Sequence, residues 1–141
     1  MSLEPSPREN EIAKSVLDAA FRVHKTLGPG LLENVYEICL EHELLKAGFK
    51  ARRQSVLPVV YDGIKVEAGF RLDLVVEETI LVEIKATEEM HPIHRAQLYT
   101  YLKLTGKRSG LLINFNVQYL KDGIPRVICA ESPSDGAGFQ S

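Results

Sequence analysis

Residues 71–85 read RLDLVVEETILVEIK, two runs of largely apolar residues on either side of a short turn at residues 77–79. Such runs predict two strands, and a connection this short requires them to pair antiparallel. If the turn has three residues, one side of the pair is apolar throughout, with Val76 opposite Ile80, Leu74 opposite Val82 and Leu72 opposite Ile84. A slip of one residue would mix apolar and charged side chains, so the apolar face fixes this register.

The other face of the same strand pair brings charged side chains together. In this register Asp73 lies opposite Glu83 and Arg71 opposite Lys85, and directly opposed Cβ atoms are about 4.5–5.5 Å apart. Two facing carboxylates repel each other, so a cation must offset their charge or one of them must hold a proton. Carboxylate oxygens are ligands that Mg²⁺ and Mn²⁺ prefer. The pattern therefore indicates a divalent-metal site, with the ammonium of Lys85 in reach of a phosphate oxygen or an attacking water.

A simpler interpretation is an exposed hairpin in which the two carboxylates form surface ion pairs with Arg71 and Lys85, which contribute little to stability. The apolar pair Val75 and Leu81 on the same face favours the metal site instead. Charge beside apolar residues indicates a partly covered pocket, where an unpaired charge is costly.

The rest of the chain indicates a helical beginning and a mixed α/β remainder. Apolar residues at spacings of three and four predict helices over residues 11–27 and 32–47, which a Gly-Pro-Gly turn at residues 28–30 separates. After Gly48 the period changes to two. The other expected strands cover residues 56–61, 64–69, 109–115 and 126–129. Pro58 marks an edge or a bulge in the first of them, and residues 109–115 are expected to be buried on both faces. A third helix is expected over residues 92–105.

The composition is that of a globular domain. The 17 Lys and Arg residues against 19 Asp and Glu give a net charge of -2, which argues against a surface that grips nucleic acid all over, since cationic side chains supply most non-specific affinity. A local basic face built from residues 50–53, 103–108 and 121–126 stays open. Cys39 and Cys129 fit no metal or disulfide pattern and are expected to be reduced thiols. No apolar run approaches the ~20 residues that span a bilayer, so we expect a cytoplasmic protein without membrane contact.

Three motifs resemble those of a known group of nucleases. Asp73, followed by the EIK sequence of residues 83–85, resembles the D…(D/E)-x-K signature of the PD-(D/E)XK nuclease superfamily. Residues 30–36 read GLLENVY, a GxxExxY motif, and Gln97 with Tyr101 is similar to the QxxxY motif of the RecB-like branch. The order of the motifs also agrees. Over most of its length the chain resembles the bacterial GxxExxY family.

The resemblance implies a role for each motif residue. It implies that Mg²⁺ or Mn²⁺ is held by Glu33, Asp73, Glu83 and the backbone carbonyl of Ile84. It also implies that Lys85 is the catalytic lysine and that Gln97 is a catalytic residue that lines the site. One departure is Leu72, because many members of the superfamily have proline before the first aspartate. Many other members also lack that proline, so this departure changes little.

Four side chains are candidates for substrate contact, namely Tyr36, Tyr101, His94 and Arg71. Tyr36 lies on the same helical face as Glu33, and core packing with a hydroxyl anchored near the site is the simpler interpretation. His91 and His94 have no third ligand at zinc-like spacing, so a helix-capping or substrate-adjacent role is expected. The Gly-Pro-Gly turn lacks the lysine of a P-loop and is expected to direct Glu33 inward.

Together these features predict an α/β protein with a restriction-endonuclease-like core, a mixed central sheet of four to five strands flanked by helices. One domain is expected over residues 10–130, between a flexible N-terminus at residues 1–9 and a disordered tail at residues 131–141. The expected function is hydrolysis of phosphodiester bonds in DNA, with RNA as second choice, by a metal-activated water. Two alternatives stay open: a catalytically quiet nucleic-acid-binding or assembly module of the same fold, and a structure-specific, junction-type nuclease that acts as a homodimer.

Overall fold

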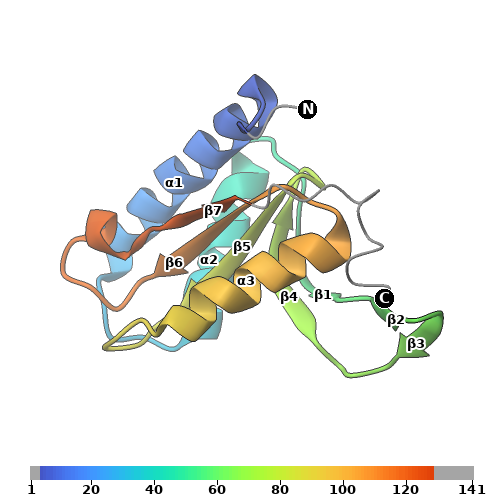
Figure 1. Ribbon diagram of the computed structural model, residues 1–141. Helices are drawn as coiled ribbons and strands as arrows, with labels where there is room; N and C mark the ends of the chain where they lie inside the picture. Colours follow the sequence, from blue (N-terminus) through green and yellow to red (C-terminus); the bar gives the residue numbers. More distant parts are fainter. Residues whose placement is uncertain (1–3, 129–141) are drawn as a thin grey trace.

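The computed structural model describes residues 4–128, which form a mixed β-sheet with helices on both faces (Figure 1). Its helices are α1 (Pro7–Leu27), α2 (Glu33–Lys46) and α3 (Pro92–Thr105), with a short 3-10 helix η1 (Leu120–Gly123). Its strands are β1 (Ala51–Val56), β2 (Val59–Tyr61), β3 (Ile64–Val66), β4 (Arg71–Val76), β5 (Ile80–Lys85), β6 (Ser109–Asn114) and β7 (Arg126–Ile128). The expected disordered tail and Cys129 lie outside the described residues.

The central sheet has the strand order β1-β4-β5-β6-β7. Only the β5–β6 pair is parallel among these described strands, and α3 makes the crossover between its two members. The prediction of a mixed sheet of four to five strands is therefore confirmed. Strand β6 is buried at every position, as predicted, because helices cover the sheet on both sides.

Two apolar clusters hold the helices to the sheet. Helices α1 and α2 pack on one face, where their stripes meet alternate residues of β4, β5 and β6. Helix α3 packs on the other face through Leu98, Tyr101 and Leu102. Among residues 4–128, no helix has both the length and the apolar composition that crossing a membrane requires.

Helix α1 begins at Pro7, four residues before the predicted start. Ser6 accepts a hydrogen bond from the N–H of Glu9, and the carboxylate of Glu9 accepts one from the N–H of Ser6. This capping box satisfies two N–H groups at the helix start, and Pro7 occupies a first helical position. Residues 7–9, expected in a flexible terminus, are therefore helical.

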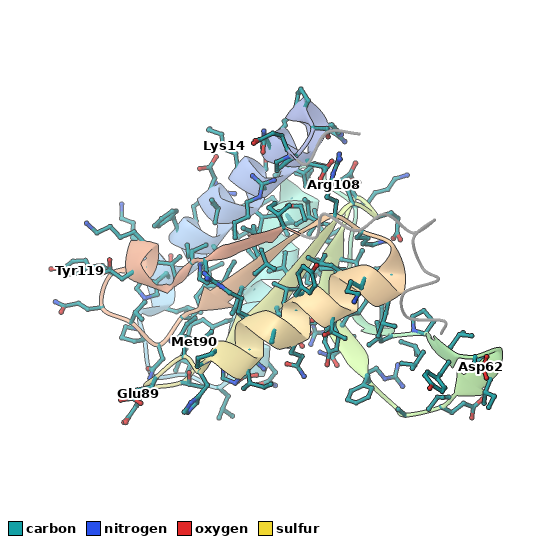
Figure 2. The ribbon with its side chains drawn as sticks, viewed as in Figure 1. Lys14, Asp62, Glu89, Met90, Arg108 and Tyr119 are labelled. Carbon is teal, nitrogen blue, oxygen red and sulfur yellow. The ribbon has the colours of Figure 1, made fainter. Side chains whose placement is uncertain are left out.

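The strands predicted over residues 56–61 and 64–69 are wrong in part. Strand β1 starts at Ala51 and pairs with β4 at the edge of the central sheet, whereas β2 and β3 form a separate two-stranded hairpin. Pro58 lies in the break between β1 and β2, because it has no N–H to donate to a ladder. Residues 60–70 are all exposed. Figure 2 shows Asp62 at the tip of this hairpin, clear of the sheet and helices.

Candidate active site

The β4–β5 hairpin has the register that its apolar face predicted. Val76 pairs with Ile80 and Leu74 with Val82. Glu77 and Glu78 both have a positive φ, near +53° and +52°, a conformation that costs energy for residues other than glycine. Their carboxylates are held from outside the turn, because Glu77 accepts hydrogen bonds from Lys50 N and Arg8, and Glu78 from Arg52. These bonds explain why the turn needs no glycine.

Strand β4 changes the face it presents at Asp73. Leu74 packs in the cluster under α1 and α2, whereas Leu72 packs in the cluster under α3. Residues two apart in a regular strand face the same side, so the strand is irregular between them. Gln54 lies at the matching place in β1 with a φ of +53°. The predicted pairing of Leu72 with Ile84 on the apolar face is therefore wrong.

The irregularity opens a gap between β4 and β5, which the Asp73 carboxylate enters. Its Oδ2 accepts a hydrogen bond from the N–H of Ile84 at 2.8 Å. Glu83 Oε1 in turn accepts a long one, 3.5 Å, from the N–H of Asp73. The two carboxylates are adjacent, as the sequence predicted, but side-chain bonds to the opposite backbone bring them together instead of a regular ladder.

Glu83 is the most strongly perturbed acid of the site. Its side chain is buried, with only 6% of the residue exposed. Burial and, second, the charge of Asp73 raise the pKa of Glu83 to about 9, while Lys85 offsets a smaller part. A carboxyl group in this position is protonated at neutral pH unless a cation compensates its charge.

Helix α3 places Gln97 and Tyr101 against the two acids. Burial and the charges of Glu83 and Asp73 raise the pKa of the Tyr101 phenol, whereas a hydrogen bond with Gln97 opposes that shift. Tyr101, with Gln97 bonded to it, therefore lies within electrostatic range of the carboxylates. Both residues lie on one face of the helix because they are four positions apart.

Lys85 is the cation of the site, and His94 lies within electrostatic range of it. Burial lowers the pKa of His94, and the charges of Lys85 and His91 lower it further, while Glu33 opposes them. The Nδ1 atom of His94 is buried and has no hydrogen-bond partner among residues 4–128. Lys85, His91 and Glu33 are therefore all within electrostatic range of His94.

The acid of α2 that is buried toward Asp73 is Glu37, which the sequence analysis missed. Glu37 is 4% exposed and accepts hydrogen bonds from Arg53 at 3.1 Å and Gln54 at 2.8 Å. Burial raises its pKa, and the charge of Asp73 adds to that effect. Glu33, the first residue of α2, is exposed. Glu37 lies one helical turn beyond Glu33, but its burial depends on Arg53 and Gln54 of β1, so no local sequence signal marked it.

Tyr36 packs in the core, the simpler of its two interpretations, whereas Arg71 is not opposite Lys85 as expected. Tyr36 is fully buried and stacks on Phe115 with ring centroids 4.6 Å apart. Its hydroxyl donates to the carbonyl of Gly28 at 2.7 Å and accepts from the N–H of Leu31 at 3.0 Å, so it anchors the turn before α2 and is closed to substrate. Arg71 is exposed and donates to the carbonyl of Gln54; the expected pairing opposite Lys85 is absent from the β4–β5 register.

The donor set of the gap fits a hard divalent cation. Mg²⁺ is commonly bound by one or two carboxylates with waters and substrate phosphates, and Asp73 with Glu83 supplies two. The Ile84 carbonyl also faces this gap. The N–H of Ile84 points toward β4, where it bonds Asp73, and the N–H and carbonyl of one strand residue point to the same side. The carbonyl of the next residue, Lys85, points the other way and accepts a hydrogen bond from the N–H of Phe115 on the β6 side. Within residues 4–128, no three His, Cys, Asp or Glu side chains form a ready metal-holding group.

These observations define the class of protein. A mixed sheet with helices on both faces, and two acids and a lysine at an opened strand pair, is a restriction-endonuclease-like core. The family model of the PD-(D/E)XK nuclease superfamily matches residues 10–127, and the chain belongs to this superfamily. No curated protein and no solved structure matches the chain significantly. A nuclease-type function with nucleic acid as substrate follows from this membership.

Proposed function

We propose that this chain is a divalent-metal-dependent nuclease whose catalytic groups are Asp73, Glu83, Lys85, Gln97 and Glu33. The observation that carries the proposal is the pair of adjacent carboxylates between β4 and β5, of which Glu83 is buried and Asp73 half-buried. Without a cation, this arrangement is electrostatically unfavourable, as the pKa of about 9 at Glu83 indicates. A site that disfavours its own charges in this way is typical of a functional centre.

Each residue has a role that its placement supports. Asp73 and Glu83, with the Ile84 carbonyl, would hold Mg²⁺ or Mn²⁺, which when bound lowers the pKa of a water and neutralises charge on the phosphate. The hydrogen bond from Ile84 N–H fixes the orientation of Asp73. The ammonium of Lys85 stabilises negative charge that develops on the phosphate oxygens. Glu33, exposed at the start of α2 and within electrostatic range of His94, would act on the metal through water.

Helix α3 supplies three further residues. Gln97 is hydrogen-bonded to Tyr101 and would orient its hydroxyl near the two acids. His94, within electrostatic range of Lys85, would contact a phosphate or the leaving group. Glu37 is a positioning residue, because its bonds to Arg53 and Gln54 hold the distorted part of β1 that lies against Asp73.

The proposal also covers the subfamily of this chain and its substrate. The GLLENVY and QxxxY motifs support the GxxExxY family and the RecB-like branch, and DNA in the bacterial cytoplasm is the substrate that we favour over RNA. Binding of nucleic acid without cleavage would instead fit the quiet module of the same fold. A homodimer with two facing sites would fit a junction-type nuclease.

Lys85→Ala is the decisive test. The purified protein should cleave labelled DNA with Mg²⁺ or Mn²⁺ but not with a chelator, and Lys85→Ala should reduce the rate by at least about 100-fold, since one electrostatic stabiliser of a transition state is worth that much. Gel electrophoresis of time courses on single-stranded, duplex and branched substrates measures this. The matched control is Lys14→Ala on α1, an exposed lysine paired with Asp18, which should leave the rate unchanged. Equal rates for the Lys85 variant and the wild type would refute the proposed role.

A further inference from the structure

Phe70 is an exposed aromatic side chain at the edge of the candidate site. It is 47% exposed, and its ring centroid lies 6.4 Å from that of Tyr101, with the planes tilted by 53°. The Phe70 carbonyl accepts a hydrogen bond from the N–H of Leu57 at 3.0 Å, which fixes its backbone at the start of β4. Because β4 is irregular at Asp73, the residues before it point toward the face of the sheet that α3 covers. Phe70 lies on this face together with Leu72.

Tyr101 connects this ring to the two acids. The charges of Glu83 and Asp73 act on its phenol, and Gln97 is hydrogen-bonded to it. Phe70 therefore contacts a residue that is within electrostatic range of both carboxylates. Phe70 is also only three residues before Asp73 in the chain, so a nucleotide bound at the carboxylates has a base near this ring.

An exposed aromatic residue is common on protein surfaces and carries no argument alone. Phe21 shows this, because it is 44% exposed on α1, which packs on the other face of the sheet. What distinguishes Phe70 is its ring contact with a residue of the site. Aromatic faces stack on nucleobases of any sequence, and each such contact contributes about 5- to 100-fold in affinity.

We propose that Phe70 is a base-stacking platform and that the site takes nucleic acid with an unpaired base at that point. This inference rests on the proposed function and adds a substrate class to it: single-stranded or locally opened nucleic acid rather than intact duplex. In a duplex each base is covered by its stacked neighbours, so its face is closed to a protein side chain unless the base leaves the stack. Arg71, the next residue in the chain, is exposed and donates to the Gln54 carbonyl, and its charge favours a nucleic-acid backbone near this strand.

The chain contains no tryptophan, so Phe70→Trp places a single fluorescent reporter at the proposed platform. Titration with oligothymidylate in a chelating buffer prevents cleavage and should quench this emission, because a stacked base quenches an indole. A duplex of the same length should quench it much less. Phe21→Trp, the control of matched exposure, should show no quenching. Far-ultraviolet circular dichroism checks that both variants fold.

Binding is measured independently by the anisotropy of a labelled oligonucleotide. Phe70→Ala should weaken binding of oligothymidylate by about 5- to 100-fold, and Phe70→Tyr should restore most of it. The wild-type protein should bind an oligonucleotide whose sugars carry no bases more weakly than oligothymidylate, by a similar factor. This comparison needs no substitution in the protein. An unquenched tryptophan at position 70 despite binding, equal affinity for the baseless strand, or no binding at all would each overturn the platform.

The two proposals fail in different ways. A chain that cleaves with Mg²⁺ but leaves the reporter at position 70 unquenched refutes the stacking platform alone. A chain whose reporter is quenched by single strands, yet which cuts nothing with any divalent metal, keeps the platform and refutes the nuclease.

Discussion

At the scale of single residues, Glu83 shows how the site opposes the stability of the fold. Its side chain is buried beside Asp73, which raises its pKa from an ordinary 4.5 to about 9. Between these values the folded metal-free protein binds a proton that the unfolded chain releases. The free energy of unfolding should therefore fall as pH rises from about 4.5 to 9.

Glu83→Gln removes this titration and should stabilise the metal-free protein at neutral pH. One pKa unit corresponds to about 1.4 kcal/mol, so the gain at pH 7 is up to about 3 kcal/mol, and it should vanish near pH 4. Urea unfolding across this pH range in a chelating buffer measures it. Glu88→Gln, at an exposed loop position, is the control and should follow the wild type. If the Glu83→Gln variant and the wild type lose stability equally with rising pH, Glu83 is not the group responsible.

The same scale shows what the sequence could and could not predict about the site. Asp73 and Glu83 were placed together because the apolar face of their hairpin allows one register only. Glu37 was missed, since a glutamate in the middle of α2 has no local feature that separates it from an exposed one. Its burial depends on Arg53 and Gln54, which come from a distant strand.

At the scale of elements, helix α3 is held against the sheet by a close approach at Gly110 of β6. A Cβ atom at this position would lie 3.0 Å from Leu98 Cδ1 and 3.2 Å from the carbonyl oxygen of Leu81. The helix that carries Gln97 and Tyr101 can therefore reach its place only because position 110 lacks a side chain.

Gly110→Ala should destabilise the protein by about 1–3 kcal/mol, the usual cost of overpacking a filled core. Because the side chain of Leu98 is one half of the clash, Leu98→Ala should remove part of that cost. Urea unfolding of both single variants and the double variant gives the coupling as a double-mutant cycle. Additive effects of the two substitutions would show that the helix does not pack on Gly110 in this way.

Elements also differ in how far their local sequence determines them. Helices α1 and α3 were predicted from apolar spacing and from the residues that begin or end them. The irregularity in β4 was not predicted. It arises because Asp73 bonds to the backbone of β5 and because Gln54 of β1 has a left-handed backbone conformation. Strand β1 itself was misplaced, since its ARRQSV sequence has the polar character of an edge strand.

At the scale of the whole molecule, contacts between distant parts of the chain close the structure around the sheet. Glu9 at the start of α1 forms an ion pair of 2.6 Å with Arg108, just before β6. Arg126 of β7 donates to Asn10 at 2.7 Å and to Ser109 at 3.0 Å. These contacts join α1 to the edge of the sheet opposite β1.

The β2–β3 hairpin, by contrast, lies outside this closed body (Figure 1). Val59 pairs with Val66, and Val60 with Lys65, so the tip beyond Val59 and Val66 contains only exposed residues. At the base of the hairpin, the N–H of Leu57 bonds the carbonyl of Phe70, and this bond does not involve the tip. The core should therefore be indifferent to the length of the hairpin.

Replacing residues 60–65 by Asn-Gly tests this independence, because a two-residue turn of that type joins paired strand ends such as Val59 and Val66. The free energy of unfolding should change by less than about 0.5 kcal/mol, as for other changes remote from the core. Urea unfolding measures the change, with Gly110→Ala as a core variant that must show a larger loss in the same assay. A loss of more than about 2 kcal/mol in the shortened chain would mean that the hairpin tip packs on the body of the protein and is part of its fold.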